Sequence, residues 1–278
     1  MKFSKMHGLG NDFIIINNII EKIRFTKQLI INLSNRYLGI GFDQLLSIEL
    51  PYNKNYDFHY RIFNSNGNEV TQCGNGVRCF AYYLKKKKMI NKNKIKIKTN
   101  NKKMLLEIIN KNNIKVNMGK PNFNKNFIPF IKCFAKNYYI KLKKIKIKFD
   151  TLSLGNPHCI IQVNNLKKIN VNFLGYIISK HISFPQGVNV SFMEIKKTNY
   201  IKLRVYERDV GETKSCGSAA CAAVAIGIKK KILSNKKVKV NLPGGNLYIK
   251  YKGLKNNLYM IGPASYVYDG KINIKKFI

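Results

Sequence analysis

The sequence predicts an α+β protein built from two similar domains, each combining several strands with one long helix. One observation is a cysteine–glycine–helix pattern that occurs twice, and another is a set of polar landmarks that recurs at a nearly constant offset. The third is alternation of Lys with Ile, as in Lys94–Lys98, which is typical of half-exposed antiparallel strands. A chain of 278 residues with 45% hydrophobic content is long enough for two cores.

The first cysteine pattern places Cys73 directly before Gly74-Asn75-Gly76 and an apolar run at helical spacing that reaches Leu84. A cysteine at a helix N-terminus lies beside unpaired N–H groups and the positive end of the helix dipole. Both favour an anion there, either a bound carboxylate or the thiolate itself. Taken alone, the stretch fits a buried structural cysteine before a core helix better than a functional one.

A second copy of this pattern, in which Cys216 precedes Gly217, Ser218 and an alanine-rich helix, favours the functional interpretation. Leu9 recurs as Leu154, at an offset of 145 residues, and the other landmarks recur at nearly the same offset. The recurring pairs are Leu9-Gly10-Asn11 with Leu154-Gly155-Asn156, Gln44 with Asn189, Asn64 with Glu207, and Cys73 with Cys216. The chain is therefore predicted to contain two related halves.

In the first half, Thr26 is expected to cap a helix over Lys27–Tyr37 that Gly39 ends. The buried side of this helix is expected to include Leu29, Ile30, Leu33 and Tyr37. Residues 7–13 are expected to form a glycine-punctuated loop. The expected strands are 1–3, 13–16, 44–50, 58–63, 94–98, 104–109 and 113–116.

In the second half, the expected elements follow the same order and end in a hairpin turned at Pro243-Gly-Gly245. The others are a strand pair at 140–154, a loop at 155–158, a short helix at 173–181, strands at 188–195 and 201–207, and the Cys216 helix. Gly119-Lys-Pro121 is interpreted as the linker between halves. A last strand at 266–268 is expected to return to the first half, so the predicted domains are 1–118 plus 263–278, and 119–262.

The formal net charge of +38 invites a nucleic-acid or anionic-membrane interpretation. Only six of the 51 basic residues are Arg, and the Lys residues are spread among Asn and Ile. That composition indicates an AT-rich coding bias more than a recognition surface, so no specific nucleic acid is expected as a partner. The apolar helical runs fall short of the roughly 20 residues that span a bilayer, and the N-terminus lacks an apolar signal core. We therefore expect a cytoplasmic protein without a membrane partner.

Six cysteines in a reducing compartment are expected to be thiols. Their spacing does not fit a zinc knuckle, so no metal site is predicted, and Cys133 and Cys159 are interpreted as small core residues.

Two matched halves that each present a thiol suggest a reaction that needs a group on either side of one atom, such as inversion of an α-carbon. One thiolate would remove the proton from one face, and the opposing thiol would protonate the other face. N–H groups of Gly74, Asn75, Gly217 and Ser218 would stabilise the carbanion's carboxylate. The same helix ends are expected to lower the pKa values of both thiols from about 8.5.

Motifs along the whole chain resemble those of the diaminopimelate epimerase family, in the same order. They are His7-Gly-Leu-Gly-Asn-Asp-Phe13, Gln72-Cys-Gly-Asn-Gly76, Gly155-Asn-Pro-His158, Gln186-Gly-Val-Asn189, Glu207-Arg208, Gly211-Glu-Thr213, Cys216-Gly-Ser218 and Gly262-Pro-Ala264 with Val267-Tyr-Asp-Gly270. The resemblance implies a cofactor-independent epimerase that interconverts LL- and meso-diaminopimelate for lysine and peptidoglycan synthesis. It also implies a homodimer, with each domain a mostly antiparallel sheet wrapped around a central helix and the active site in the cleft between the domains.

Carried over by position, the resemblance makes Cys73 and Cys216 the catalytic acid/base pair. It assigns adjustment of the thiol pKa values to His158 and Glu207, and a dimer-interface position to Tyr268. The residues that it places around the substrate are Asn11, Gln44, Asn64, Gly74, Asn75, Asn156, Asn189, Glu207, Arg208, Gly217 and Ser218. Among them, Arg208 could bind the second carboxylate of the substrate through two parallel hydrogen bonds from its guanidinium group.

Three positions depart from the family pattern: Asn66 replaces Asp, while Asp209 and Ala219 each replace Gly. At Asp209, either a backbone angle that favours glycine or the added negative charge beside Arg208 is expected to weaken binding of the distal carboxylate. Two alternatives stay open at this point. One is a proline-racemase-like or PhzF-like isomerase on the same fold, and the other is a basic nucleic-acid-binding protein that uses the fold as a scaffold.

Overall fold

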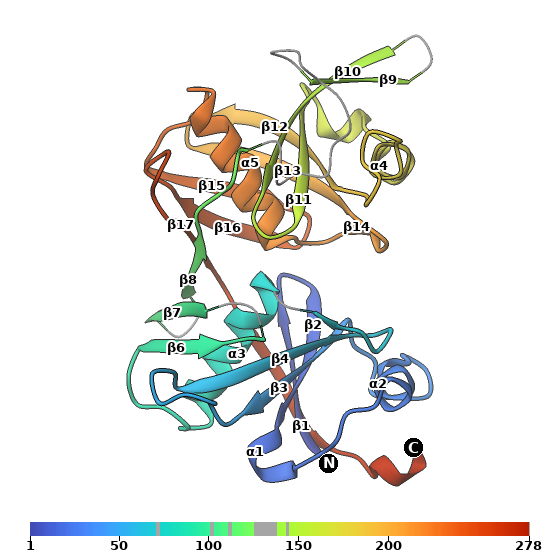
Figure 1. Ribbon diagram of the computed structural model, residues 1–278, viewed down its shortest axis with the longest axis vertical. Coiled ribbons are helices and arrows are strands. Elements are labelled where there is room, and N and C mark those ends of the chain that lie inside the picture. Colours follow the sequence, from blue (N-terminus) through green and yellow to red (C-terminus); the bar gives the residue numbers. More distant parts are fainter. Residues whose placement is uncertain (71–72, 101–102, 111–112, 125–137, 143–144, 278) are drawn as a thin grey trace. The chain divides into compact units, whose positions relative to one another are not determined.

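The computed structural model describes residues 1–70, 73–100, 103–110, 113–124, 138–142 and 145–277. Cys133 and Gln72 lie outside these ranges, so the expected core role of Cys133 stays a prediction. The chain divides into two compact units, one formed by residues 1–116 and 262–278 and the other by residues 117–261 (Figure 1).

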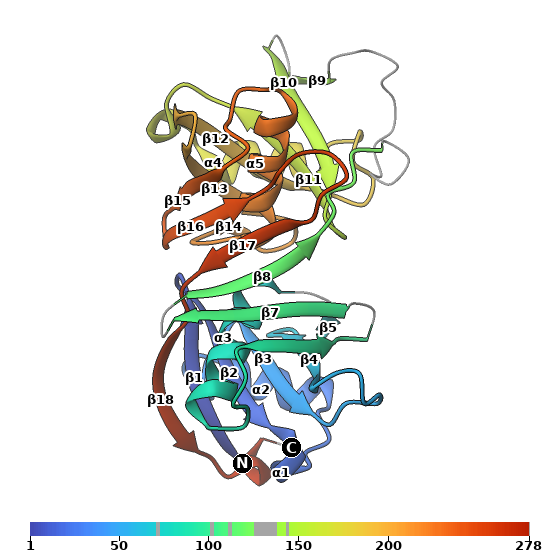
Figure 2. The same ribbon diagram turned by 90° about the vertical axis from the view of Figure 1, so that its left-hand side faces the viewer.

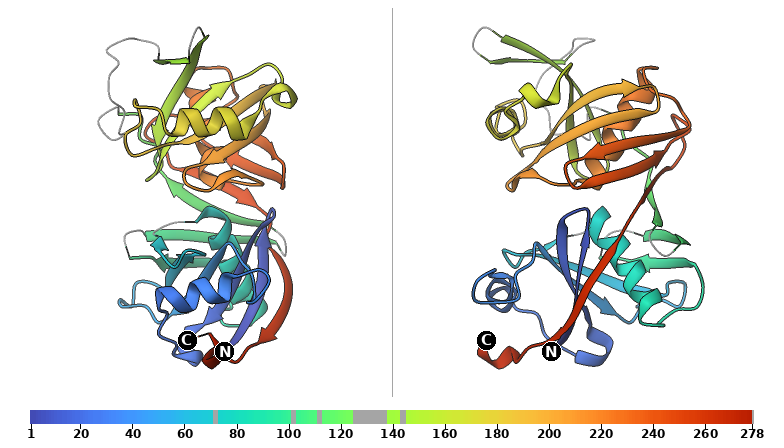
Figure 3. Two further views of the ribbon diagram at one scale, coloured as in Figure 1. Left: turned by 90° about the vertical axis from the view of Figure 1, so that its right-hand side faces the viewer. Right: turned by 180° about the vertical axis from the view of Figure 1, so that it is seen from behind.

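The first unit is a mixed sheet in the strand order β18-β1-β2-β3-β4-β6-β7-β8, with the short β5 paired to β4. β2 and β3 are parallel, as are β4 and β6, and the other neighbours are antiparallel. The strands are β1 (Lys2–Gly8), β2 (Asn11–Asn17), β3 (Gln44–Glu49), β4 (Phe58–Asn64), β5 (Glu69–Val70), β6 (Lys94–Lys98), β7 (Lys103–Asn110), β8 (Asn113–Gly119) and β18 (Ser265–Lys271). The last strand, β18, thus returns to the first unit, as predicted, and pairs there with β1 (Figure 3).

The helix α3 (Gly74–Lys86) lies inside the curve of this sheet and contacts β1, β2, β3, β7 and β18 (Figure 2). Its apolar residues Val77, Phe80, Ala81 and Leu84 are fully buried. Lys85 and Lys86 occupy its last turn, where cations offset the negative end of the helix dipole. A second cluster on the other face of the sheet includes Leu29, Ile30 and Leu33 of α2 (Lys27–Ser34). The short helices α1 (Asn18–Glu21) and η3 (Ile274–Lys276) complete the unit.

The sheet of the second unit has the same arrangement as the sheet of the first unit. Its strand order is β10-β11-β12-β13-β15-β16-β17, with β9 beside β10 and β14 beside β13. β11 and β12 are parallel, as are β13 and β15, like their counterparts in the first unit. The strands are β9 (Tyr138–Leu142), β10 (Ile145–Ser153), β11 (Pro157–Gln162), β12 (Asn189–Lys197), β13 (Tyr200–Glu207), β14 (Gly211–Thr213), β15 (Lys237–Leu242), β16 (Gly245–Lys250) and β17 (Leu258–Gly262). This agreement confirms the prediction of two similar α+β halves.

The central helix of the second unit, α5 (Gly217–Lys229), is buried around almost its whole circumference. A helix that is apolar on all sides belongs in a core, and the small Ala residues let four strands approach it. α4 (Val171–Ser179) and the short η2 (Leu166–Lys168) cover part of the opposite face of the sheet. Within the described ranges, every helix is too short or too polar to span a bilayer.

The expected loop over residues 7–13 is wrong, because β1 and β2 continue into a hairpin whose turn is only Leu9-Gly10. Both turn residues have positive φ, 58° and 85°, as a two-residue hairpin turn with the twist of its strands requires. Gly10 supplies such an angle easily, whereas Leu9 gives no sequence signal for it.

The helix that begins after Thr26 is shorter than predicted. The Thr26 side chain accepts the N–H of Leu29, which confirms the cap, but the helix ends at Ser34. Asn35 leaves helical geometry, and its side-chain oxygen accepts the N–H groups of Tyr37 and Leu38. Tyr37 is consequently 95% exposed, so its expected burial is wrong.

Candidate active site

The polar landmarks of the first unit meet at one edge of its sheet. Asn11 begins β2 and Gln44 begins β3, and because these strands are parallel, their first residues lie at the same edge. β4 runs antiparallel to β3 and ends there at Asn64, which pairs with Gln44. The Gln44 amide donates to Asn64 Oδ1 at 2.7 Å. Parallel pairing of segments distant in sequence therefore brings three amides together.

Cys73 is the N-cap of α3 and is partly exposed. Its Sγ accepts the N–H of Gly76 at 3.2 Å and lies 3.9 Å from Asn11 Oδ1. Gly76 has to be glycine, because a Cβ there would lie 2.8 Å from the buried Tyr60 hydroxyl. The buried Asn75 donates to the same Asn11 oxygen at 3.4 Å. The first turn of α3 thus directs one N–H group, that of Gly76, at the sulfur.

The second unit places its landmarks at the corresponding sheet edge. Asn156 directly precedes β11, Asn189 begins the parallel strand β12, and Glu207 ends β13. The Asn189 amide donates to the Pro157 carbonyl at 3.3 Å, and its oxygen accepts the Arg208 N–H at 3.0 Å. These bonds hold the ends of the three strands together beside the N-terminus of α5.

Cys216 is the N-cap of α5 and is only 5% exposed. Its Sγ donates to Glu207 Oε2 at 3.2 Å and lies 3.4 Å from the Ser218 hydroxyl. The other Glu207 oxygen accepts the Thr213 hydroxyl at 2.7 Å. Glu207 is thereby fixed with one oxygen on the thiol.

The expected lowering of the thiol pKa values is wrong for Cys216. Burial raises the pKa of its thiol well above the usual value, and the negative charge of Glu207 raises it further. Hydrogen bonds from Ser218 and from the N–H of Ala219 act in the opposite direction but do not outweigh burial. The sequence shows the helix N-terminus but not the depth at which the sulfur is buried.

His158 is fully buried on β11, and burial lowers its pKa to about 3, so the ring is neutral near pH 7. Its Nε2 lies 3.1 Å from Asn156 Oδ1, and Asn156 Nδ2 lies 3.5 Å from the Ser218 hydroxyl. His158 therefore reaches Cys216 through two intervening side chains. An influence on the thiol would pass through the orientation of Asn156 and Ser218.

Arg208 is exposed at the end of β13, and its Nη1 donates to the Gln186 carbonyl at 2.6 Å. Asp209 has φ 62°, the left-handed conformation expected where the family has glycine. Its carboxylate bonds to Lys180 at 2.7 Å, while Arg208 Nε is 3.8 Å away. Asp209 thus pairs more closely with Lys180 than with Arg208.

The other two departures from the family pattern are accommodated locally. Asn66 lies in the turn after β4, where its side chain accepts the N–H of Asn68. Ala219 is fully buried in the first turn of α5.

Sequence reasoning missed three side chains that support the site. Thr213 fixes Glu207, and Asp43 accepts the Asn11 amide at 2.8 Å. The fully buried Arg78 donates to the Gly74 carbonyl at 3.2 Å and to the Pro263 carbonyl at 3.0 Å, which ties the start of α3 to the segment before β18. Thr213 belongs to the motif Gly211-Glu-Thr213 but was given no role, and Asp43 directly precedes Gln44, whereas no sequence pattern marked Arg78.

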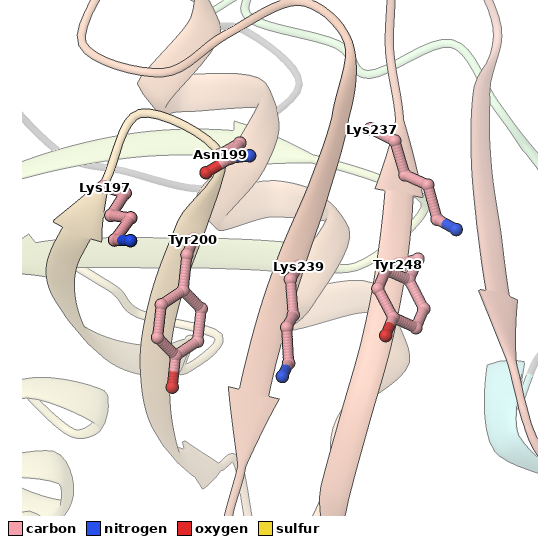
Figure 4. Close-up of a pocket in the computed structure, with 6 residues that line it drawn as sticks. All are labelled: Lys197, Asn199, Tyr200, Lys237, Lys239 and Tyr248. Atoms are coloured by element: carbon pink, nitrogen blue, oxygen red, sulfur yellow. The ribbon is translucent and has the colours of Figure 1, made fainter.

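A shallow hollow of about 440 Å³ lies on the outer face of the second sheet, away from the side chains described above. Lys197, Asn199, Tyr200, Lys237, Lys239 and Tyr248 line it (Figure 4). The ammonium groups of Lys237 and Lys239 lie 4.2 and 5.3 Å from the ring centres of Tyr248 and Tyr200. These lysines are thus already paired with aromatic rings. Within the described ranges, no group of three or more His, Cys, Asp or Glu residues could hold a metal ion.

The architecture is one shared with known isomerases and related proteins. A probable proline racemase from Agrobacterium radiobacter matches with a TM-score of 0.73 and 10% identity, over 98% of this chain and 92% of that one. A phenazine biosynthesis protein of the PhzF family from Bacillus anthracis matches with a TM-score of 0.72 and 16% identity, over 98% and 99%. Identities this low show the fold alone. The fold therefore places the chain in a structural class of proteins with two similar α+β domains, which includes the proline racemase and PhzF structures.

Sequence similarity identifies the family within this class. A family model described as diaminopimelate epimerase matches residues 3–124 and 151–267. The diaminopimelate epimerase of Blochmanniella floridana is 53% identical over 276 residues, which cover 99% of this chain and 100% of that relative. The chain belongs to the diaminopimelate epimerase family and is an isomerase, so the proline-racemase-like and PhzF-like alternative is not favoured.

Proposed function

We propose that this protein interconverts LL- and meso-diaminopimelate, with Cys73 and Cys216 acting on the same α-carbon from opposite faces. The observation that supports this most strongly is the matched placement of the two thiols. Each caps the central helix of its unit, beside three polar residues at one sheet edge. Family membership and the name of the 53% identical relative support the substrate.

In one direction, the α-carbon–hydrogen bond breaks and its proton passes to the Cys73 thiolate. The Cys216 S–H bond then breaks, and its proton forms the new bond on the opposite face. The raised pKa of Cys216 and its hydrogen bond to Glu207 support a protonated Cys216 as the acid. The reverse reaction exchanges the two roles. Negative charge that develops on the substrate is stabilised by N–H groups at the starts of α3 and α5.

The rest of the substrate is held by the polar residues around the thiols. The exposed guanidinium of Arg208 binds the distal carboxylate, and the amides of Asn11, Asn64, Asn156 and Asn189 bind the ammonium and carboxylate groups. Gln44 holds Asn64 in place through its amide, as the 2.7 Å bond indicates. The remaining positions from the family pattern are Gly74, Asn75, Gly217 and Ser218, whose N–H groups face the α-carboxylate. His158 and Glu207 adjust the thiols, the former through Asn156.

Purified protein incubated with LL-diaminopimelate is expected to produce the meso isomer without pyridoxal phosphate, and dialysis against a chelator is expected to leave the rate unchanged. Proline serves as the control substrate and should not be racemised. Proline racemisation, or loss of activity on chelation with recovery on adding metal, would contradict the proposal. A nucleic-acid-binding function would instead survive removal of either cysteine.

We further propose a homodimer in which Tyr268 lies at the interface. Tyr268 is 45% exposed on β18, where its ring packs edge-on against Phe3 at 6.1 Å. Replacing it with alanine is expected to shift the sedimentation coefficient from dimer toward monomer. Tyr139→Ala, which removes an equally exposed tyrosine from the other unit, should not do so. A monomeric parent protein would contradict this proposal.

We propose that the protein works in the cytoplasm, because the thiol and thiolate of the proposed mechanism need a reducing compartment. Cell fractionation checks this, and recovery of the protein outside the cytoplasm would contradict it.

A further inference from the structure

We propose that Asp43 is a positioning residue that fixes the orientation of the Asn11 amide, so that the amide oxygen faces Cys73. This inference rests on the proposed roles of Asn11 and Cys73. It concerns a residue outside the recurring set of polar landmarks, one that the sequence pattern did not mark.

The contact between Asp43 and Asn11 determines the direction in which the nitrogen and the oxygen of the Asn11 side-chain amide point. Asn11 Nδ2 donates to Asp43 Oδ2 at 2.8 Å. An ionised carboxylate only accepts hydrogen bonds, so the nitrogen of the amide has to point toward Asp43. The amide oxygen then has to point the opposite way.

On that opposite side lie the catalytic cysteine and the first turn of α3. Asn11 Oδ1 lies 3.9 Å from Cys73 Sγ and accepts the Asn75 amide at 3.4 Å. Asn11 therefore presents an acceptor, rather than a donor, to the sulfur and to a substrate ammonium group nearby. A reversed amide would turn N–H groups toward both.

Asp43 is itself held from several directions. Its Oδ1 accepts Arg36 Nη2 at 2.8 Å, and its Oδ2 also accepts the Asp12 N–H at 3.1 Å. Arg36 also donates to the Asp12 carboxylate with both Nη atoms, at 2.8 and 3.1 Å. Lys5 Nζ donates to the same Asp12 carboxylate at 2.6 Å. Burial raises the pKa of the Asp12 carboxyl, but hydrogen bonds from Arg36 and Lys5 outweigh it and hold the pKa well below its usual value.

The exposure of these groups argues against a mainly stabilising role. The side chains of Arg36 and Asp43 are 56% and 43% exposed, and ion pairs this exposed contribute little to folding stability. The arrangement nevertheless joins the starts of β2 and β3, so a purely structural clamp is the alternative. The two explanations differ in one respect. A positioning role acts through Asn11, whereas a clamp does not depend on the Asn11 side chain.

Asp43→Asn tests the proposal, because the amide introduced in this variant can offer N–H groups as well as an oxygen and no longer dictates the orientation of Asn11. For LL-diaminopimelate we expect KM to rise about tenfold while kcat falls less than about threefold, which matches one misdirected hydrogen bond. Alkylation of Cys73 by iodoacetamide is expected to speed up several-fold, because N–H groups that face the sulfur stabilise its thiolate. The melting temperature should change little.

The decisive step is to repeat the substitution in an Asn11→Ala background. There Asp43→Asn should change neither KM nor the alkylation rate by more than about twofold, since the residue through which it acts is gone. Equal effects in both backgrounds, or a loss of stability that accounts for the lost activity, would overturn the proposal.

Asp57→Asn is the matched control. Like Asp43, Asp57 pairs with a basic side chain, here Lys92 at 2.6 Å, and accepts a backbone N–H, that of Lys96 at 2.8 Å. It lies before the start of β4, at the far end from Asn64. The Asp57→Asn variant should have the KM of the parent protein and the same rate of Cys73 alkylation. If the parent protein did not epimerise diaminopimelate, the proposed function would fail, but the alkylation measurement would still decide the role of Asp43.

Discussion

Replacing Cys216 with serine is expected to lower kcat/KM for diaminopimelate epimerisation by at least about 1,000-fold in both directions, at the upper end of what one acid/base group contributes. Serine is close in size and keeps a hydrogen-bonding group beside Glu207, so the fold should be preserved. Its hydroxyl is, however, a far weaker acid than a thiol, and it forms almost no alkoxide even at a helix N-terminus. Cys73→Ser should have an effect of the same size, because each thiol serves as acid in one direction and as base in the other.

Cys221→Ser is the matched control, since Cys221 lies in the same helix and is fully buried but is not at the N-cap. It should retain most of the parent kcat/KM, as measured by the conversion of LL to meso isomer. A Cys216→Ser protein that epimerises near the parent rate would contradict the role of Cys216. Circular dichroism should confirm that all three variants are folded.

Replacing Glu207 with glutamine is expected to lower kcat/KM about tenfold or more and to move the alkaline limb of its pH profile to lower pH. Burial is the main cause of the raised pKa of Cys216, and the negative charge of Glu207 raises this pKa further. Removing that charge therefore lowers the pKa of Cys216. A lower pKa means that Cys216 loses its proton at a lower pH and stops acting as an acid sooner. The glutamine oxygen can still accept from the thiol, but without a charge this hydrogen bond is weaker, which accounts for the fall in rate.

Asp150→Asn is a suitable control for the Glu207 variant, because it removes one negative charge from the same unit, at a carboxylate paired with Lys230 at 2.8 Å. Its pH profile should match that of the parent. An alkaline limb that stays in place or moves to higher pH in Glu207→Gln would contradict the proposed influence of Glu207 on the Cys216 thiol.

The repeat made the two-unit architecture predictable. Because Asn11, Gln44, Asn64 and Cys73 recur as Asn156, Asn189, Glu207 and Cys216 at nearly one spacing, the sequence required two equivalent sheet edges and two capped helices. The structure has them, with the same alternation of parallel and antiparallel neighbours. The helix N-termini were also predictable, since a cysteine followed by small residues and an apolar run has few other structures.

Features that depend on tertiary environment were beyond local sequence patterns. The Leu9-Gly10 turn was hidden by a leucine in a conformation that leucine rarely adopts. The early end of α2 depends on Asn35 bonding to the backbone in place of a further helical turn. The high pKa of Cys216 follows from how deeply the sulfur is buried, and the partnership of Asp43 with Asn11 from the parallel pairing of β2 with β3. The spacing of residues in the sequence shows neither how deeply a side chain is buried nor which strands pair.

The incorporation of solvent hydrogen tests the two-thiol mechanism most directly. In heavy water, at low conversion of LL-diaminopimelate, the account predicts that the meso product carries deuterium at the inverted carbon while recovered starting isomer stays mostly protiated. The proton removed stays on one sulfur, and the proton added comes from the other sulfur, which has exchanged with solvent. Product that retained most of its original hydrogen would show a single base working on both faces and would contradict the account.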